Sequence, residues 1–84
     1  MLKVLYFARL RESLGLAGEE LPLPEGVDSV AALMAWLATR GGVWQREFAG
    51  KHLLRAAVNQ DLVAETATIQ PGDEVAFFPP VTGG

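Results

Sequence analysis

The last six residues of this chain are the best placed for chemistry, and they read Pro79, Pro80, Val81, Thr82, Gly83 and Gly84. The two prolines cannot continue a sheet ladder and favour extended polyproline geometry. The Gly-Gly end has no side chains, so it is thin enough to enter a narrow channel in another protein. We therefore expect residues 79–84 to form a protruding arm. A solvated tail without a function is the alternative.

The chemistry available to such an arm belongs to the carboxylate of Gly84. A carboxylate is a poor electrophile and must be activated, most simply as a mixed anhydride with AMP. A sulfur nucleophile could then displace AMP and leave a thiocarboxylate. That group donates sulfur without a cysteine on the carrier, consistent with the absence of cysteine from the chain. The general acids and bases would come from partner proteins.

Other sites for catalysis or metal binding have little support in the sequence. His52 is the only histidine, and a lone histidine beside Lys51 is typical of a surface or loop residue. The glycines are not followed by the Lys-Ser/Thr of a phosphate-binding loop. Trp36 and Trp44 are expected to pack rather than to bind a cofactor. We expect neither a metal nor a bound cofactor.

The size and composition fit one small domain, residues 1–84. Half of the 84 residues are hydrophobic and the net charge is −3, without a visible basic patch. No apolar run is long enough to span a bilayer, and Lys3, Arg9 and Arg11 interrupt any signal peptide. We expect a soluble cytoplasmic protein that binds neither nucleic acid nor membrane.

The first half of the chain is predicted to contain two strands, a short helix and one long helix. Residues 2–8 indicate a buried strand, 9–16 a short helix, and 19–23 an edge strand because Pro22 lies in it. A helix follows from an N-cap at Asp28 or Ser29. Gly41-Gly42 is expected to end this helix. Its apolar residues fall on one face; they are Val30, Leu33, Met34 and Leu37.

The second half is predicted to contribute a short helix at 44–48 and three strands. The strands span 53–58, 62–63 and 74–78, with a turn at 59–61. Pro71-Gly72 suits a type II turn. The order strand, strand, helix, strand, strand, strand gives an α+β fold with one main helix, which can cover only one sheet face.

Alternation along the strands predicts which side chains lie on the uncovered face. Leu2, Val4 and Tyr6 share one face of the first strand, and Lys3, Leu5 and Phe7 share the other; these six alternate strictly. If Val75 and Phe77 pack under the helix, Phe78 lies on the open face. Phe7 and Phe78 would then form a partner-binding patch. Alternatively, a loop or the segment near Trp44 covers both rings.

At this point the residues match a known family. Residues 3–8, residues 57–60 and above all residues 72–84, Gly-Asp-Glu-Val-Ala-Phe-Phe-Pro-Pro-Val-Thr-Gly-Gly, resemble the small subunit of molybdopterin synthase, the MoaD family. The resemblance covers essentially the whole chain. It implies a ubiquitin-like β-grasp fold, with a mixed sheet of four to five strands and the main helix packed on one face.

The resemblance also implies a role and partners. An E1-like adenylating enzyme would use ATP to adenylate Gly84, giving a glycyl adenylate, and a sulfurtransferase system would convert it to 1-thioglycine. The tail would then enter the large subunit of the synthase and donate sulfur to cyclic pyranopterin monophosphate. This chain would be the non-catalytic, sulfur-donating subunit. Carried over by position, its partner-binding residues are Phe7, Arg11, Leu62 and Phe78.

Two other functions would also use the Gly-Gly end. A sulfur carrier of another pathway, such as a thiamine-type carrier, would have the same fold. A ubiquitin-like modifier would use the same adenylated end for conjugation to lysines. A plain interaction module with an incidental tail is a third possibility.

Overall fold

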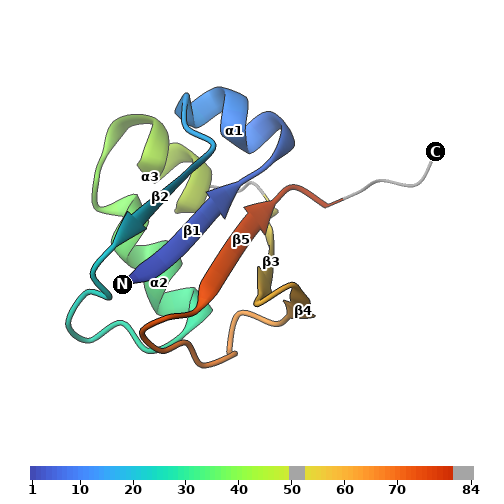
Figure 1. Ribbon diagram of the computed structural model, residues 1–84. Helices are drawn as coiled ribbons and strands as arrows, with labels where there is room; N and C mark the ends of the chain where they lie inside the picture. Colours follow the sequence, from blue (N-terminus) through green and yellow to red (C-terminus); the bar gives the residue numbers. More distant parts are fainter. Residues whose placement is uncertain (50–52, 81–84) are drawn as a thin grey trace.

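The computed structural model describes residues 1–49 and 53–80, which fold into one sheet and the helices that cover it (Figure 1). In chain order, the elements of these residues are β1 (Leu2–Tyr6), α1 (Ala8–Leu14), β2 (Gly18–Leu21), α2 (Val30–Ala38), α3 (Gly42–Phe48), β3 (Arg55–Val58), β4 (Asp61–Val63) and β5 (Glu74–Phe78). None of the helices in this part of the chain is long and apolar enough to cross a bilayer.

The sheet is mixed, with strand order β2-β1-β5-β3-β4. β1 and β5 run parallel at its centre, and the remaining neighbours are antiparallel. α2 lies behind the sheet in Figure 1, while α1 and α3 lie toward the end at which β1 and β5 finish. The expected α+β architecture with one main helix on one sheet face is confirmed.

The core lies between α2 and the covered face of the sheet. The strand residues predicted to face it are fully buried, as are three of the four apolar residues of α2; together these are Leu2, Val4, Tyr6, Val75, Phe77, Val30, Leu33 and Leu37. Met34 is half-buried at the margin. Each large apolar side chain contributes roughly 1.5–3 kcal/mol by leaving water, so this set dominates the stability.

The ends of α2 show which of the predicted start and stop residues bound this helix. Ser29 is the N-cap, since its Oγ accepts a hydrogen bond of 3.1 Å from the Ala32 N–H. The helix ends at Ala38 with Thr39 as its C-cap, before the glycine pair that was expected to end it. Gly41 and Gly42 instead have φ of 77° and 56° and turn the chain into α3.

Two turns form where the sequence predicts them. The Asp73 N–H donates to the Gln70 carbonyl at 3.1 Å and Gly72 has φ of 94°, as a type II turn requires. Asn59 and Gln60 connect β3 and β4, both with positive φ as in a type I′ hairpin turn. Asp61, expected in that turn, is the first residue of β4.

Four of the five strands have boundaries that differ from the prediction, β4 among them. β1 ends at Tyr6 rather than at residue 8, because Ala8 already begins α1 with a positive φ of 55°. β2 spans Gly18–Leu21 and is an edge strand as predicted, with Pro22 just beyond it. β3 begins at Arg55, two residues later than expected.

Candidate functional site

An apolar row crosses the uncovered face of the sheet. The pairing register aligns one residue from each strand, in spatial order Gly18, Leu5, Ala76, Ala57 and Leu62. We call this row the open-face stripe. None of its residues is charged; Leu62 at its β4 end is 63% exposed, whereas Ala76 at its centre is only 9% exposed. A continuous uncharged row on the solvent side of a sheet is a surface suited to a protein partner.

An aromatic pair lies one row further along β1 and β5. The Phe7 N–H donates to the Phe77 carbonyl at 3.1 Å, which extends the parallel pairing by one residue beyond β1. Phe7 is 44% exposed and Phe78 is half-buried. The segment near Trp44 does not cover the pair, because Trp44 packs on Tyr6 and Phe48 beneath the other face.

The remaining predicted contact residue, Arg11, is an exposed residue of α1. Its N–H donates to the Phe7 carbonyl at 3.3 Å, so α1 starts directly from the aromatic pair. The structure thus brings Phe7, Phe78 and Arg11 to one end of the sheet. Leu62 lies on the same open face, at the far end of the stripe.

The predicted arm begins at this end as well. Pro79 and Pro80 follow Phe78 directly, outside the strand, and both are half-buried. The other arm residues lie outside the described residues, as do Lys51 and His52; the arm residues concerned are Val81, Thr82, Gly83 and Gly84. Because β5 is the central strand, the arm starts from the middle of the sheet.

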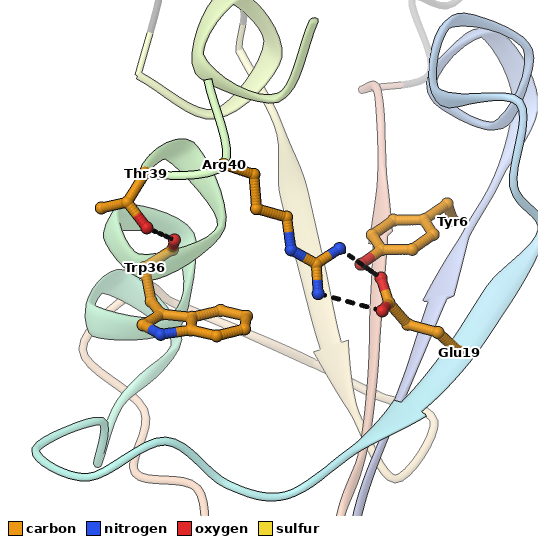
Figure 2. Close-up of polar contacts among 5 residues, drawn as sticks. All are labelled: Tyr6, Glu19, Trp36, Thr39 and Arg40. Carbon is orange, nitrogen blue, oxygen red and sulfur yellow. Dashed lines mark hydrogen bonds and ion pairs between the residues drawn. The ribbon is translucent and has the colours of Figure 1, made fainter. Parts of the chain in front are cut away.

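A polar cluster lies on the helix-covered side, at the β2 edge (Figure 2). The Tyr6 hydroxyl donates to Glu19 Oε2 at 2.8 Å, and the two Arg40 Nη atoms donate to the Glu19 carboxylate at 2.8 and 3.0 Å. The Arg40 guanidinium also lies 5.1 Å from the Trp36 ring and 4.5 Å from the Trp44 ring. Both tryptophans therefore pack, as predicted.

The pKa values in this cluster follow from these contacts. Burial opposes ionisation of Glu19, but hydrogen bonds from Arg40 and Tyr6 outweigh it and hold the Glu19 pKa below its ordinary value. Burial and the neighbouring Glu19 carboxylate raise the pKa of Tyr6. The cluster therefore stays as an ion pair with a neutral phenol, which ties β2 to the connection between α2 and α3.

A shallow groove of about 290 Å³ lies between α2 and the β3–β4 hairpin. Its lining includes Met34, Leu53, Leu54 and Val63. Leu53 is 70% exposed. Nowhere in residues 1–49 and 53–80 do three or more His, Cys, Asp or Glu side chains gather as a metal site. The open face and the arm are therefore the better candidate for function.

Comparison with protein families assigns the chain to a family. The family model described as the ThiS family matches residues 4–84. The chain belongs to the ThiS family. Its curated relatives include the molybdopterin synthase sulfur carrier subunits of Escherichia coli strain K12, at 44% identity, and Haemophilus influenzae, at 39% identity. Each alignment covers 100% of this chain and 100% of the relative, so the resemblance to the synthase small subunits is confirmed.

Solved structures of similar chains share the fold. A protein from Pyrococcus furiosus, described as molybdopterin converting factor subunit 1, superimposes with a TM-score of 0.74 at 31% identity, covering 95% of this chain and 97% of that one. A chain of the Helicobacter pylori complex of subunits 1 and 2 of molybdopterin-converting factor gives 0.65 at 20% identity, with 99% and 97% covered. The expected ubiquitin-like β-grasp fold is confirmed by these neighbours.

Sequence reasoning missed part of the open face. Ala57 lies in the open-face stripe, and Arg55 is aligned with Phe78 in the pairing of β3 with β5. Alternation within β3 would have placed both on one face, but only the cross-strand register shows which residues they adjoin. The Tyr6–Glu19–Arg40 cluster was also missed, because its members come from three separate segments.

Proposed function

We propose that this protein is the sulfur-carrying small subunit of molybdopterin synthase and works through the carboxylate of Gly84. The observation that carries the proposal is the end-to-end similarity to two molybdopterin synthase sulfur carrier subunits. The aromatic pair beside the start of the arm, with Phe7 exposed and Phe78 half-buried, supports it, since a carrier must dock before its terminal group can be transferred.

The proposed loading reaction has two steps. In the first, the Gly84 carboxylate attacks the α-phosphorus of ATP on an E1-like adenylating enzyme, and pyrophosphate leaves. In the second, hydrosulfide, released from a persulfide of the sulfurtransferase by a reducing thiol, attacks the acyl carbon, and AMP leaves. The product is 1-thioglycine at position 84. We expect this chemistry in the cytoplasm, because it consumes ATP.

Delivery takes place on the large subunit. The thiocarboxylate sulfur forms a bond to a carbon of cyclic pyranopterin monophosphate and displaces an oxygen from that carbon; water then hydrolyses the resulting thioester, which returns the Gly84 carboxylate and leaves the sulfur on the substrate. Two such transfers supply the two sulfurs of the dithiolene. This chain contributes the sulfur and the arm, while the large subunit contributes the acids and bases.

The docking surface for both partners is the open face. Phe7, Leu62 and Phe78 present apolar area that the helices leave uncovered, and Arg11 supplies a donor at its edge. The stripe between them is uncharged, so it can be desolvated at little cost.

The test is the chemical state of the C-terminal peptide, isolated from cells and fragmented in a mass spectrometer. We expect sulfur in place of one oxygen at Gly84, captured by a thiol-alkylating reagent in a protein that has no cysteine. Fragmentation is needed because oxidation of Met1 or Met34 adds nearly the same mass.

A plain carboxylate that persists after incubation with ATP, the adenylating enzyme and a sulfur source would contradict the proposal. Gly-Gly remnants linked to lysines of other proteins would assign the modifier role instead.

A further inference from the structure

Positive charge gathers at the end of the molecule from which the arm starts. Arg9 and Arg11 belong to α1, Arg46 to α3, and Arg55 is the first residue of β3, aligned with Phe78. Arg40 lies just before α3, and its guanidinium binds Glu19 beside Tyr6, the last residue of β1. We call this the arm end; it holds every described arginine, together with the acids Glu12, Glu19 and Glu47.

Negative charge gathers at the opposite end, where β1 and β5 begin. Asp73 and Glu74 stand at the start of β5, and turns and strand ends at the same level carry Glu20, Glu25, Asp28 and Asp61. Among the described residues, Lys3 is the basic side chain at this end, and it is aligned with Glu20 on one side and Glu74 on the other. The folded chain is therefore an electric dipole.

Two arginines of the arm end are already paired. Arg9 Nη1 lies 3.2 Å from the buried Glu47 carboxylate, and Arg40 pairs with Glu19. Within residues 1–49 and 53–80, no other ion pair forms, so Arg11, Arg46 and Arg55 present unpaired charge. All three are exposed.

Arg11 and Arg55 flank the aromatic pair. Ala56 is 5% exposed and faces the core, so its neighbour Arg55 faces the open side of the sheet, beside Phe78. Arg11 lies one helical turn after Phe7. The aromatic pair thus has a guanidinium on the β3 side and another on the α1 side.

We propose that Arg11 and Arg55 bind carboxylates that frame the apolar docking pocket of the large subunit, and that the molecular dipole steers this protein onto the large subunit arm end first. The inference rests on the proposed function, which supplies the partner. It adds the partner's surface chemistry and the role of Arg55, a residue with no place in the proposed sulfur chemistry.

Electrostatic theory sets what such steering can achieve. Complementary charge raises association rates by roughly 10- to 1,000-fold, and the effect falls steeply with ionic strength. The arrangement also orients the encounter, because the acidic end of this chain is repelled by the same carboxylates that attract its arm end.

The experiment measures the association rate of the full-length protein with the purified large subunit by stopped-flow fluorescence, between about 0.02 and 0.5 M salt. The test variant is Arg11→Gln with Arg55→Gln. Lys3→Gln is the control for position, because it removes one positive charge, against two in the test variant, from the same face at the opposite end. Arg55→Lys keeps the charge, and circular dichroism verifies that every variant is folded.

We expect the double variant to associate about 5- to 10-fold more slowly at low salt and to converge with the unsubstituted protein at high salt. Lys3→Gln and Arg55→Lys should stay within about twofold of it. Equal slowing by Lys3→Gln, or slowing that salt does not abolish, would overturn the inference and leave the proposed function standing. Failure of the unsubstituted protein to bind the large subunit would contradict the proposed function itself.

Discussion

At the scale of single residues, the open face is distinguished by the large apolar side chains that it leaves exposed to water. Leu62 and Phe7 are 63% and 44% exposed although they belong to or adjoin strands of a well-packed sheet. Single exposed apolar residues are common on proteins. Here they share one face with an uncharged stripe, and that shared position makes them candidates for contact with a partner.

Leu62 and Leu53 form a matched pair for testing this face. Both are exposed leucines, but Leu53 lines the groove beside α2 instead of the open face. Leu62→Ala should weaken binding to the large subunit by about 1–2 kcal/mol, or roughly 5- to 30-fold in Kd, as truncation of an interface anchor does. Leu53→Ala should leave the Kd unchanged in the same calorimetric titration. Equal losses would exclude the open face as the docking surface.

Glu19 sets an acid-dependent part of the stability. Its folded-state pKa lies below the ordinary value of 4.5, so its contribution is present above that pH and is lost as the pH falls below it. Glu19→Gln should lower the free energy of unfolding at pH 7 by about 1 kcal/mol. The variant should also lose less stability than the unsubstituted protein between pH 5 and pH 3. Parallel curves of unfolding free energy against pH would refute this role for Glu19.

At the scale of elements, alternation and turn residues carried most of the sequence prediction. Period-two burial in β1 and β5 identified the covered face, and Ser29 and Gly72 marked a helix start and a turn. The strand ends were less predictable, because Ala8 adopts a positive φ that an alanine does not signal. The register between strands could not be predicted, since it depends on how two distant segments pair. Arg55 and Ala57 were missed for this reason.

The contact between β2 and β1 leaves no room for a side chain at Gly18. A Cβ there would lie 2.8 Å from Leu5 Cδ2 and 3.0 Å from the Val4 carbonyl oxygen. Gly18→Ala should therefore reduce the free energy of unfolding by about 1–3 kcal/mol, measured by urea unfolding. It should also weaken large-subunit binding, because Leu5 belongs to the open-face stripe.

A double-mutant cycle separates the cause of that loss. Leu5→Ala removes the side-chain atom that a Cβ at Gly18 would meet, so Gly18→Ala should be less costly in the Leu5→Ala background. Strict additivity of the two changes would show that the Leu5 contact is not the source of the strain.

At the scale of the whole molecule, the parts that fold the chain and the part proposed to react are separate. In the described residues, the buried core spans Leu2 to Phe77, ending before Pro79. The proposed reacting group, Gly84, comes seven residues after the last core residue. Stability and sulfur transfer should therefore respond to different substitutions.

Deletion of Gly84 tests this separation. We expect sulfur transfer to be abolished, while the free energy of unfolding stays within about 0.5 kcal/mol of the full-length value. Affinity for the large subunit should change little, because the open face is intact. A stability loss of roughly 2–5 kcal/mol, the size caused by a core truncation, would show that the end of the chain belongs to the folded body.

The open-face stripe takes one residue from every strand, and this has a consequence for the abundance of the protein. A partner that covers the stripe contacts all five strands together, so it recognises only the native chain. Binding to the native state alone adds about 2.7 kcal/mol of stability when the free partner is at a hundred times its Kd. Proteases that act on unfolded chains will then remove copies in excess of the partner. We therefore expect the concentration of the large subunit to set how much of this protein survives.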